Sequence, residues 1–136
     1  MVEQTLIFLK PDAVRNRLTG RIISRFEDRG FKIRGMRMLT LTSELSDKYY
    51  AEHIDKPFYP GLKDYVMSGP IVAVVLEAEN AVSVVRRMVG DTDAGLAQPG
   101  TIRGDFALLK SENGIHASDS PESAQREIAN FFESLV

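Results

Sequence analysis

Most of the side chains that could perform chemistry lie in one run of eight residues, 113–120. The run holds the amide of Asn113, the imidazole of His116, the hydroxyl of Ser118 and the carboxylate of Asp119. Histidine has an unperturbed pKa of about 6.5, so most of it is neutral at pH 7, and a neutral imidazole can act as a nucleophile or a base. A single histidine beside apolar residues is more often a hydrogen-bonded structural group. A catalytic role for His116 therefore requires support from other residues.

A second set of polar side chains falls near the ends of the expected helices and strands: Lys10, Arg86, Thr92, Arg103 and Asn113. Arginine supplies parallel donors and lysine a point charge, and both suit a polyphosphate. The chain has no G-x-x-x-x-G-K-[ST] stretch and no G-x-G-x-x-G after a strand, so side chains would have to hold the phosphates. Considered alone, Arg86 is more simply interpreted as a charged residue on the solvated face of a helix. Arg103 lies in a loop rich in glycine and proline, where packing does not require it.

Length and composition exclude several other classes of protein. The chain has 136 residues, which predicts a single domain over 1–136. It has no cysteine, which excludes disulfides, thiolate metal sites and cysteine nucleophiles. The formal net charge of -2 argues against nucleic acid as the main partner. The N-terminus lacks a signal-peptide pattern and the longest apolar run, 71–76, is too short to span a bilayer, so we expect a cytoplasmic protein without a membrane partner.

The apolar pattern predicts the elements that must position these side chains. Nearly continuous apolar runs at 5–9 and 71–76 predict strands buried on both faces. Residues 31–41 predict a third strand whose phase slips, with Gly35 as the bulge. A short fourth strand is expected near His116.

Helices are expected between these strands and after the last of them. Their predicted starts are Thr19, Ser43, Pro60, Asn80 and Ser120. The last of these helices has an apolar stripe made of Ala124, Ile128, Phe131 and Leu135. Residues 91–115 show no periodicity and predict a long loop. Strands that alternate with helices predict an α/β sandwich, with a ferredoxin-like βαββαβ core whose four-stranded antiparallel sheet has helices packed on it.

Three motifs together resemble the nucleoside diphosphate kinase family. They are KPDA at residues 10–13, PGTIRGD at residues 99–105 and N-x-x-H-x-S-D at residues 113–119. The resemblance runs in order over essentially the whole chain. It implies a ferredoxin-like fold and a phosphotransferase, which moves the γ-phosphate of a nucleoside triphosphate to a nucleoside diphosphate through a phosphohistidine.

The same resemblance implies roles for particular residues. His116 corresponds to the phosphorylated nucleophile, which would give ping-pong kinetics. Glu127 is similar to the carboxylate that orients the imidazole, and Ser118 to the residue that hydrogen-bonds this glutamate. Tyr50 is similar to a tyrosine near the transferred phosphate. An exposed helix glutamate and a plain turn serine are the alternatives for Glu127 and Ser118.

The resemblance also implies a nucleotide site. The phosphate contacts would be Lys10, Arg86, Thr92 and Arg103, and Lys10 and Asn113 would also meet the sugar hydroxyls. Phe58 corresponds to the aromatic that stacks on the base, with Leu62 beside it, although core packing is the simpler reading of both. Mg2+ would travel on the phosphates, with Asp119 as a candidate for a water-mediated contact.

Two departures from the family pattern stand out. Ala117 replaces the usual glycine after the histidine, where a methyl group would narrow the expected turn, and residues 92–98 lack an asparagine-proline pair in a loop that often helps subunits meet. The family implies a homo-oligomer, for which we favour a hexamer over a tetramer.

Two rival functions remain. One is a nucleotide sensor or nucleic-acid binder on the same fold. The other is a histidine-metal hydrolase, which two histidines support poorly.

Overall fold

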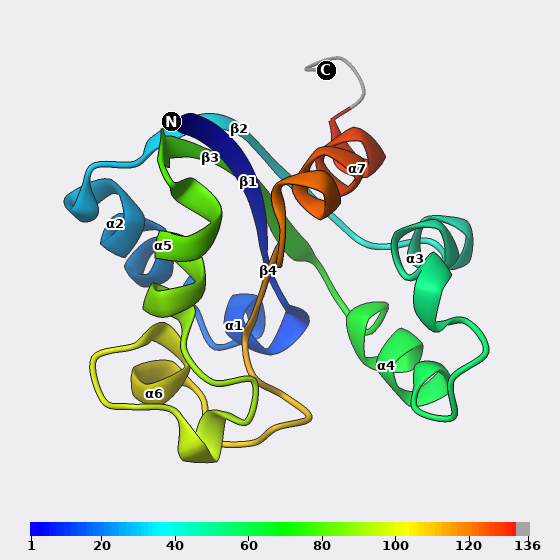
Figure 1. Ribbon diagram of the computed structural model, residues 1–136. Helices are drawn as coiled ribbons and strands as arrows, with labels where there is room; N and C mark the ends of the chain where they lie inside the picture. The colour runs from blue at the N-terminus through cyan, green and yellow to red at the C-terminus, as the bar shows by residue number, and fades with distance from the viewer. Residues whose placement is uncertain (133–136) are drawn as a thin grey trace.

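A computed structural model of the chain describes residues 1–132 and contains one four-stranded antiparallel sheet (Figure 1). Its strands are β1 (Val2–Leu9), β2 (Lys32–Leu39), β3 (Ile71–Glu79) and β4 (Ile115–Ala117), in the order β2-β3-β1-β4. All three neighbouring pairs are antiparallel. This sheet and its intervening helices confirm the predicted ferredoxin-like fold.

The two central strands, β1 and β3, have continuously apolar sequences because most of their residues are buried on both faces of the sheet. In β1, the residues from Leu6 to Leu9 are 0% exposed, because helices cover both faces of the sheet there. The edge strand β2 is mostly exposed and alternates instead. Its register with β3 slips between Ile33 and Gly35, which leaves Arg34 as an extra residue and confirms the predicted bulge.

Seven helices and two short 3-10 turns connect and follow the strands within residues 1–132. The helices are α1 (Pro11–Arg15), α2 (Thr19–Arg29), α3 (Ser43–Tyr49), α4 (Tyr59–Val66), α5 (Ala81–Val89), α6 (Ile102–Phe106) and α7 (Pro121–Phe131). The 3-10 turns are η1 (Ala51–His53) and η2 (Ala94–Leu96). The long loop predicted for residues 91–115 is therefore wrong in part, since η2 and α6 lie within it. Thr101 caps α6 by accepting a hydrogen bond from the Gly104 amide.

Several helix starts differ from the prediction by one residue or by the capping group. Thr19 and Ser43 are the first residues of α2 and α3 rather than their caps, and the Thr42 hydroxyl caps α3. Asn80 holds the cap position of α5 in a left-handed conformation, but the Glu3 carboxylate accepts the Val82 amide proton in its place. The first turn of α5 is thus capped by a side chain that is distant in sequence, because the local residue Asn80 makes no capping hydrogen bond.

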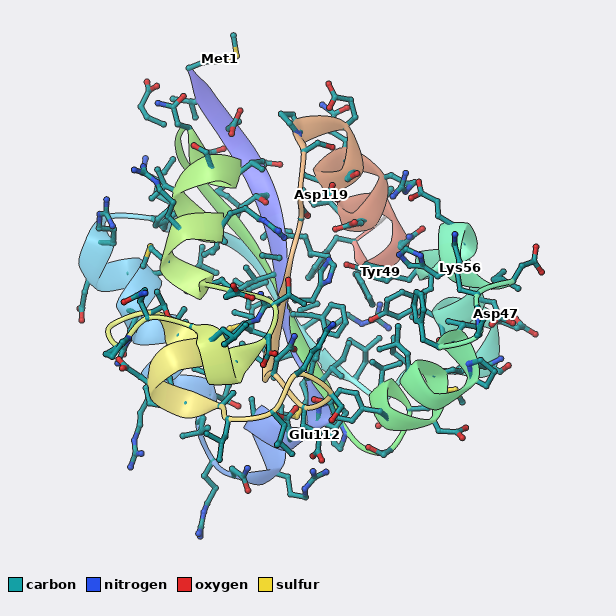
Figure 2. The ribbon with its side chains drawn as sticks, turned by 60° about the horizontal axis from the view of Figure 1, so that its bottom comes forward. Met1, Asp47, Tyr49, Lys56, Glu112 and Asp119 are labelled. Carbon is teal, nitrogen blue, oxygen red and sulfur yellow. The ribbon has the colours of Figure 1, made fainter. Side chains whose placement is uncertain are left out.

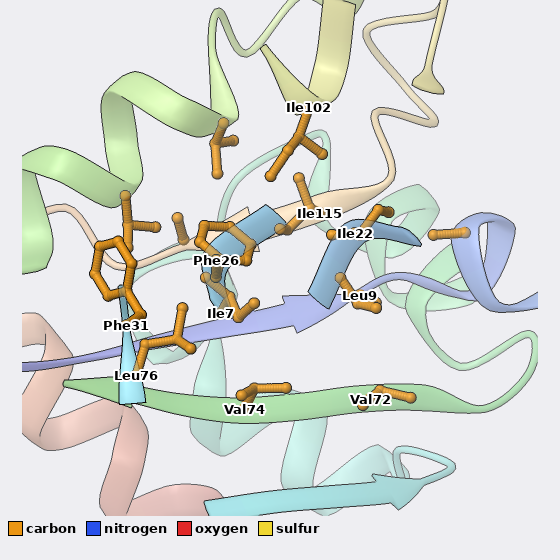
Figure 3. Close-up of a cluster of buried hydrophobic side chains, with 14 of the residues drawn as sticks. Ile7, Leu9, Ile22, Phe26, Phe31, Val72, Val74, Leu76, Ile102 and Ile115 are labelled. Carbon is orange, nitrogen blue, oxygen red and sulfur yellow. The ribbon is translucent and has the colours of Figure 1, made fainter. Parts of the chain in front are cut away.

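The sheet separates two hydrophobic clusters because successive side chains of a strand point to opposite faces. Ile7 and Leu9 face the cluster under α2, α5 and α6, where Phe26 is fully buried (Figure 3). Leu6 and Phe8 face the cluster under α3, α4 and α7. Of the predicted apolar stripe of α7, Ala124, Ile128 and Phe131 are buried, and Leu135 lies outside the described residues. No helix within residues 1–132 is long and apolar enough to cross a membrane.

Candidate active site

His116 is held at the middle of the short strand β4, opposite Phe8 of β1. Its ring stacks on Phe8 with a centroid distance of 5.2 Å and meets Tyr49 edge-on at 5.3 Å. Tyr49 lies at the end of α3, and Asp119 follows where the chain passes from β4 to α7 (Figure 2). The two aromatic rings fix the plane of the imidazole and shield part of it from water, while its side chain stays 26% exposed.

The charge state of His116 follows from these surroundings. Burial lowers its pKa below the ordinary value, and the cations Lys10 and Arg103 act in the same direction. Glu127 opposes them but does not outweigh burial. The imidazole is therefore neutral at pH 7, as a nucleophile must be.

A carboxylate and a hydroxyl from neighbouring elements hold one side of the imidazole. The Nε2 atom of His116 lies 3.4 Å from Oε1 of Glu127, which projects from α7. The hydroxyl of Ser118 donates to the same Oε1 at 2.7 Å and also lies against the backbone of Leu6. Burial raises the pKa of Glu127, but the hydrogen bonds from His116 and Ser118 outweigh it, and the net shift is downward. An ionised Glu127 can only accept, so Nε2 carries the proton and Nδ1 has the free lone pair.

Lys10 and Asn113 form a second polar group at the exit of β1. The Nζ of Lys10 donates to Oδ1 of Asn113 at 2.7 Å, and the Asn113 amide donates to the backbone oxygen of Thr92 at 2.9 Å. Burial and the charge of Arg103 lower the pKa of Lys10 to about 8, against the opposing effect of Asp12. An anionic ligand beside Lys10 would raise this pKa again and so favour the charged form of the lysine.

The two arginines are tied to backbone oxygens near β4. Arg103 is only 5% exposed and donates to the oxygens of Gly90 at 3.0 Å and Ile115 at 2.7 Å. Burial and Arg86 lower its pKa to about 10, so it stays charged at pH 7. Arg86 donates to the oxygen of Ala117 at 3.2 Å. Ala117 itself is a buried strand residue rather than part of a turn, so its methyl group packs in the core and narrows no turn.

The predicted residues divide between two cavities. A cavity of about 200 Å³ is lined by Tyr50, Arg86, His116, Asp119 and Glu127, among others. A larger one of about 990 Å³ is lined by Lys10, Phe58, Leu62, Thr92 and Asn113, among others. Arg103 and Ser118 line neither of these two cavities. Ser118 instead donates to Glu127, which lines the smaller cavity, and Arg103 holds the backbone on either side of the site, at Gly90 and Ile115.

The exposure of Phe58 argues against core packing, which was one of the two interpretations of that residue. Its side chain is 55% exposed at the start of α4, although a phenylalanine in the core would be buried. Leu62 follows one turn later and is half-buried. An exposed ring at the wall of a large cavity is available for stacking on a flat ligand.

Some residues near the site carry little or no signal in the sequence. Phe8 and Tyr49 belong to ordinary apolar patterns, yet they hold the His116 ring. Asp12 and Tyr65 meet through a hydrogen bond beside Lys10. The only available signal was the position of Asp12 within the KPDA motif.

The described residues offer no ready-made metal cage. Within residues 1–132, no three or more His, Asp or Glu side chains gather where they could hold a metal ion. Two exposed carboxylates, Glu52 and Asp119, line the smaller cavity with His116, and Glu52 is already paired with Arg126. This donor set suits a hard cation that keeps its waters and takes most of its other ligands from phosphates. It does not suit a histidine-metal hydrolase.

Comparison with known proteins gives a consistent result. A model of the family described as nucleoside diphosphate kinase matches residues 3–135. A nucleoside diphosphate kinase from Staphylothermus marinus is 55% identical over 131 residues, covering 96% of this chain and 93% of that protein. The solved structure of a halophilic nucleoside diphosphate kinase from Halobacterium salinarum in complex with CDP aligns with a TM-score of 0.94 and 43% identity, covering 98% of this chain and 89% of that one. The enzyme from Aquifex aeolicus also aligns at 0.94, with 44% identity over 97% of this chain and 96% of that one.

Proposed function

The chain belongs to the nucleoside diphosphate kinase family, which moves the γ-phosphate of a nucleoside triphosphate to a nucleoside diphosphate through a phosphohistidine, and we propose that His116 is that histidine. It is therefore an enzyme of nucleotide metabolism that binds nucleotides and transfers phosphate. The observation that carries the assignment of His116 is the ionised Glu127 at its Nε2. This contact directs the lone pair of Nδ1 away from Glu127 and opposes the positive charge that the ring gains.

In the first half-reaction, Nδ1 of His116 attacks the γ-phosphorus of the triphosphate. The new bond is N–P, and the bond from the γ-phosphorus to the bridging oxygen breaks, so the nucleoside diphosphate leaves with that electron pair. In the second half-reaction, a terminal oxygen of a different diphosphate attacks the same phosphorus. The N–P bond then breaks and His116 returns to its neutral form. One site thus serves both nucleotides in turn.

We propose that the cations hold the phosphates during both steps. Arg86 lines the cavity with His116, and Arg103 supports β4 from behind while adding positive charge. Burial raises the pKa of Tyr50, so its hydroxyl stays protonated and can donate to the transferred group. Such donors stabilise charge spread over the equatorial oxygens of a loose transition state.

We propose that the larger cavity takes the nucleoside part of the substrate. Phe58 and Leu62 would hold the base, while Lys10, Asn113 and Thr92 would meet the sugar and phosphates. The Halobacterium salinarum relative was solved with CDP, which supports a diphosphate at this site. Stacking on an exposed ring reads no base edge, so all bases should be accepted.

The family generally needs a divalent metal, and we propose Mg2+. Asp119 would contact its water shell, and the metal would neutralise charge on the phosphates.

We also propose that residues 1–136 form a single domain and that the protein works in the cytoplasm, where nucleotides are exchanged. We further propose that it forms a homo-oligomer, a hexamer in preference to a tetramer. Exposed apolar side chains support association. They include Met36 and Met38 on the edge strand β2, and Leu96 and Leu108 in the segments on either side of α6. Closed assemblies larger than a dimer commonly need more than one kind of contact.

The proposal is tested by replacing His116 with alanine. The variant should lose phosphate transfer and keep its affinity for ADP within about twofold, because the cavity around the base is separate from the imidazole. Substantial residual transfer would exclude His116 as the nucleophile. Salt-sensitive binding of single-stranded nucleic acid without turnover in the unmodified protein would favour the rival binding function.

A further inference from the structure

We propose that Asp12 and Tyr65 form a positioning pair that fixes helix α4, with its base-stacking residues, against the phosphate-binding Lys10. The proposal rests on the nucleotide site described above and adds two residues to it. Neither residue reaches His116 in this arrangement, so the pair acts on nucleotide binding rather than on phosphate transfer.

The hydrogen bond between the two side chains joins distant elements. Tyr65, in the last turn of α4, donates its hydroxyl proton to Oδ1 of Asp12, in the first turn of α1. The two residues are 53 positions apart, and Asp12 is only 7% exposed. Hydrogen bonds to a buried carboxylate are among the stronger ones in proteins. The bond therefore constrains where α4 lies relative to the end of β1.

Helix α4 carries the proposed base site on the same side as Tyr65. Leu62 lies three residues before Tyr65, so the two side chains share a face of the helix, and Phe58 is the residue that precedes the helix. Tyr65, Leu62 and Phe58 all line the larger cavity. A shift of α4 would therefore move Phe58 and Leu62 together, away from the position in which they hold the base.

The ring of Tyr65 also faces Lys10. The Nζ of Lys10 lies 5.9 Å from the ring centroid while it donates to Asn113 at 2.7 Å. The backbone amide of Lys10 donates to the oxygen of Gly114 at 2.8 Å, which fixes the lysine to the turn before β4. Tyr65 thus contacts the phosphate-binding cation with its ring and the neighbouring carboxylate with its hydroxyl.

The first test is Tyr65→Phe, which removes the hydroxyl and keeps the ring. We expect KM for both the donor and the acceptor nucleotide to rise about tenfold, with a matching rise in the ADP dissociation constant measured by calorimetry. The single-turnover rate of His116 phosphorylation at saturating ATP should stay within about twofold of the unmodified protein.

The matched control is Tyr59→Phe on the same helix. Tyr59 also donates its hydroxyl to a carboxylate, that of Asp47, at 2.7 Å, but it does not line the nucleotide cavity. The control should lower the melting temperature and leave KM unchanged. If Tyr65→Phe behaves in the same way, the Tyr65 bond is only structural and the proposal is overturned.

A second variant, Asp12→Asn, separates the charge of the pair from its hydrogen bond. The asparagine oxygen can still accept from Tyr65, so ADP affinity at pH 6.5 should change less than in Tyr65→Phe. Lys10 is faced by Arg103 from α6, Asp12 from α1, Tyr65 from α4 and His116 from β4, and Asp12 is the one that favours its charged form. Loss of ADP affinity with rising pH should therefore begin at a lower pH in Asp12→Asn. An unchanged pH profile would contradict the electrostatic effect of Asp12 on Lys10.

These results are distinguishable from failure of the proposed function. If the unmodified protein does not phosphorylate His116, the function fails whatever the variants do. If it does, and Tyr65→Phe binds ADP as tightly as the unmodified protein, the positioning pair alone is wrong.

Discussion

Replacing Glu127 with glutamine tests how the imidazole is activated. Glutamine has nearly the same size and can still accept one hydrogen bond, but it lacks the negative charge. Glu127 is 6% exposed, so solvent screens its charge weakly. The phosphorylated ring is more positive than the free one, so the charge of Glu127 favours the transition state over the ground state.

The structure sets the size of the expected effect. A hydrogen bond to an ionised group contributes about 1.5–3 kcal/mol. The distance of 3.4 Å between Nε2 of His116 and Oε1 of Glu127 is near the long limit for such a bond, which favours the lower end of that range. A loss of about 1.5–2 kcal/mol lowers the phosphorylation rate roughly 10- to 30-fold.

The assay is a single-turnover rapid quench with γ-labelled ATP at saturating concentration, followed by measurement of label on the protein. ADP affinity is measured alongside, and it should be unchanged because Glu127 lines only the smaller cavity. Ser118→Ala is the matched control, since it removes the 2.7 Å bond to Glu127 but keeps the charge, and its effect should be smaller. A Glu127→Gln rate within about twofold of the unmodified protein would show that the charge of Glu127 does not stabilise the transition state.

Two further predictions concern the nucleotide. Phe58→Ala should weaken ADP, GDP, CDP and UDP by similar factors of about 5- to 100-fold, as expected for loss of stacking, and an effect confined to purines or to pyrimidines would show that something else reads the base. Because burial and Arg103 lower the pKa of Lys10 to about 8, the cation is lost as pH rises through that value, and ADP affinity should fall above it. Lys10→Arg should abolish this decline, and a flat affinity profile up to about pH 10 in the unmodified protein would contradict it.

The sequence predicts those parts of the fold whose pattern comes from burial. The strands β1 and β3 are buried on both faces, so their apolar runs are visible without any tertiary information. Gly35 marks the bulge because the apolar phase changes beside it. The short helices α1 and α6 are missed because five residues show too little periodicity, and α6 contains a glycine as well.

The residue pattern alone predicts the site only as a set of residues, and the pairing of Glu127 with His116 comes from the family resemblance. His116 and Glu127 are 11 residues apart, and only the turn from β4 into α7 brings them together. The division of the polar residues between two cavities depends on how α4 packs beside the end of β1, and no local pattern encodes it. The same holds for Phe8 and Tyr49, because stacking partners are set by tertiary structure.

The central claim is that His116 carries the phosphoryl group between two nucleotides. We would mix the protein with γ-labelled ATP, quench the reaction, and locate the label by peptide mapping. We expect label on His116 that is lost in acid, stable in base, and removed when a nucleoside diphosphate is added. Nucleotide bound without label on the protein, or label on another residue, would contradict it.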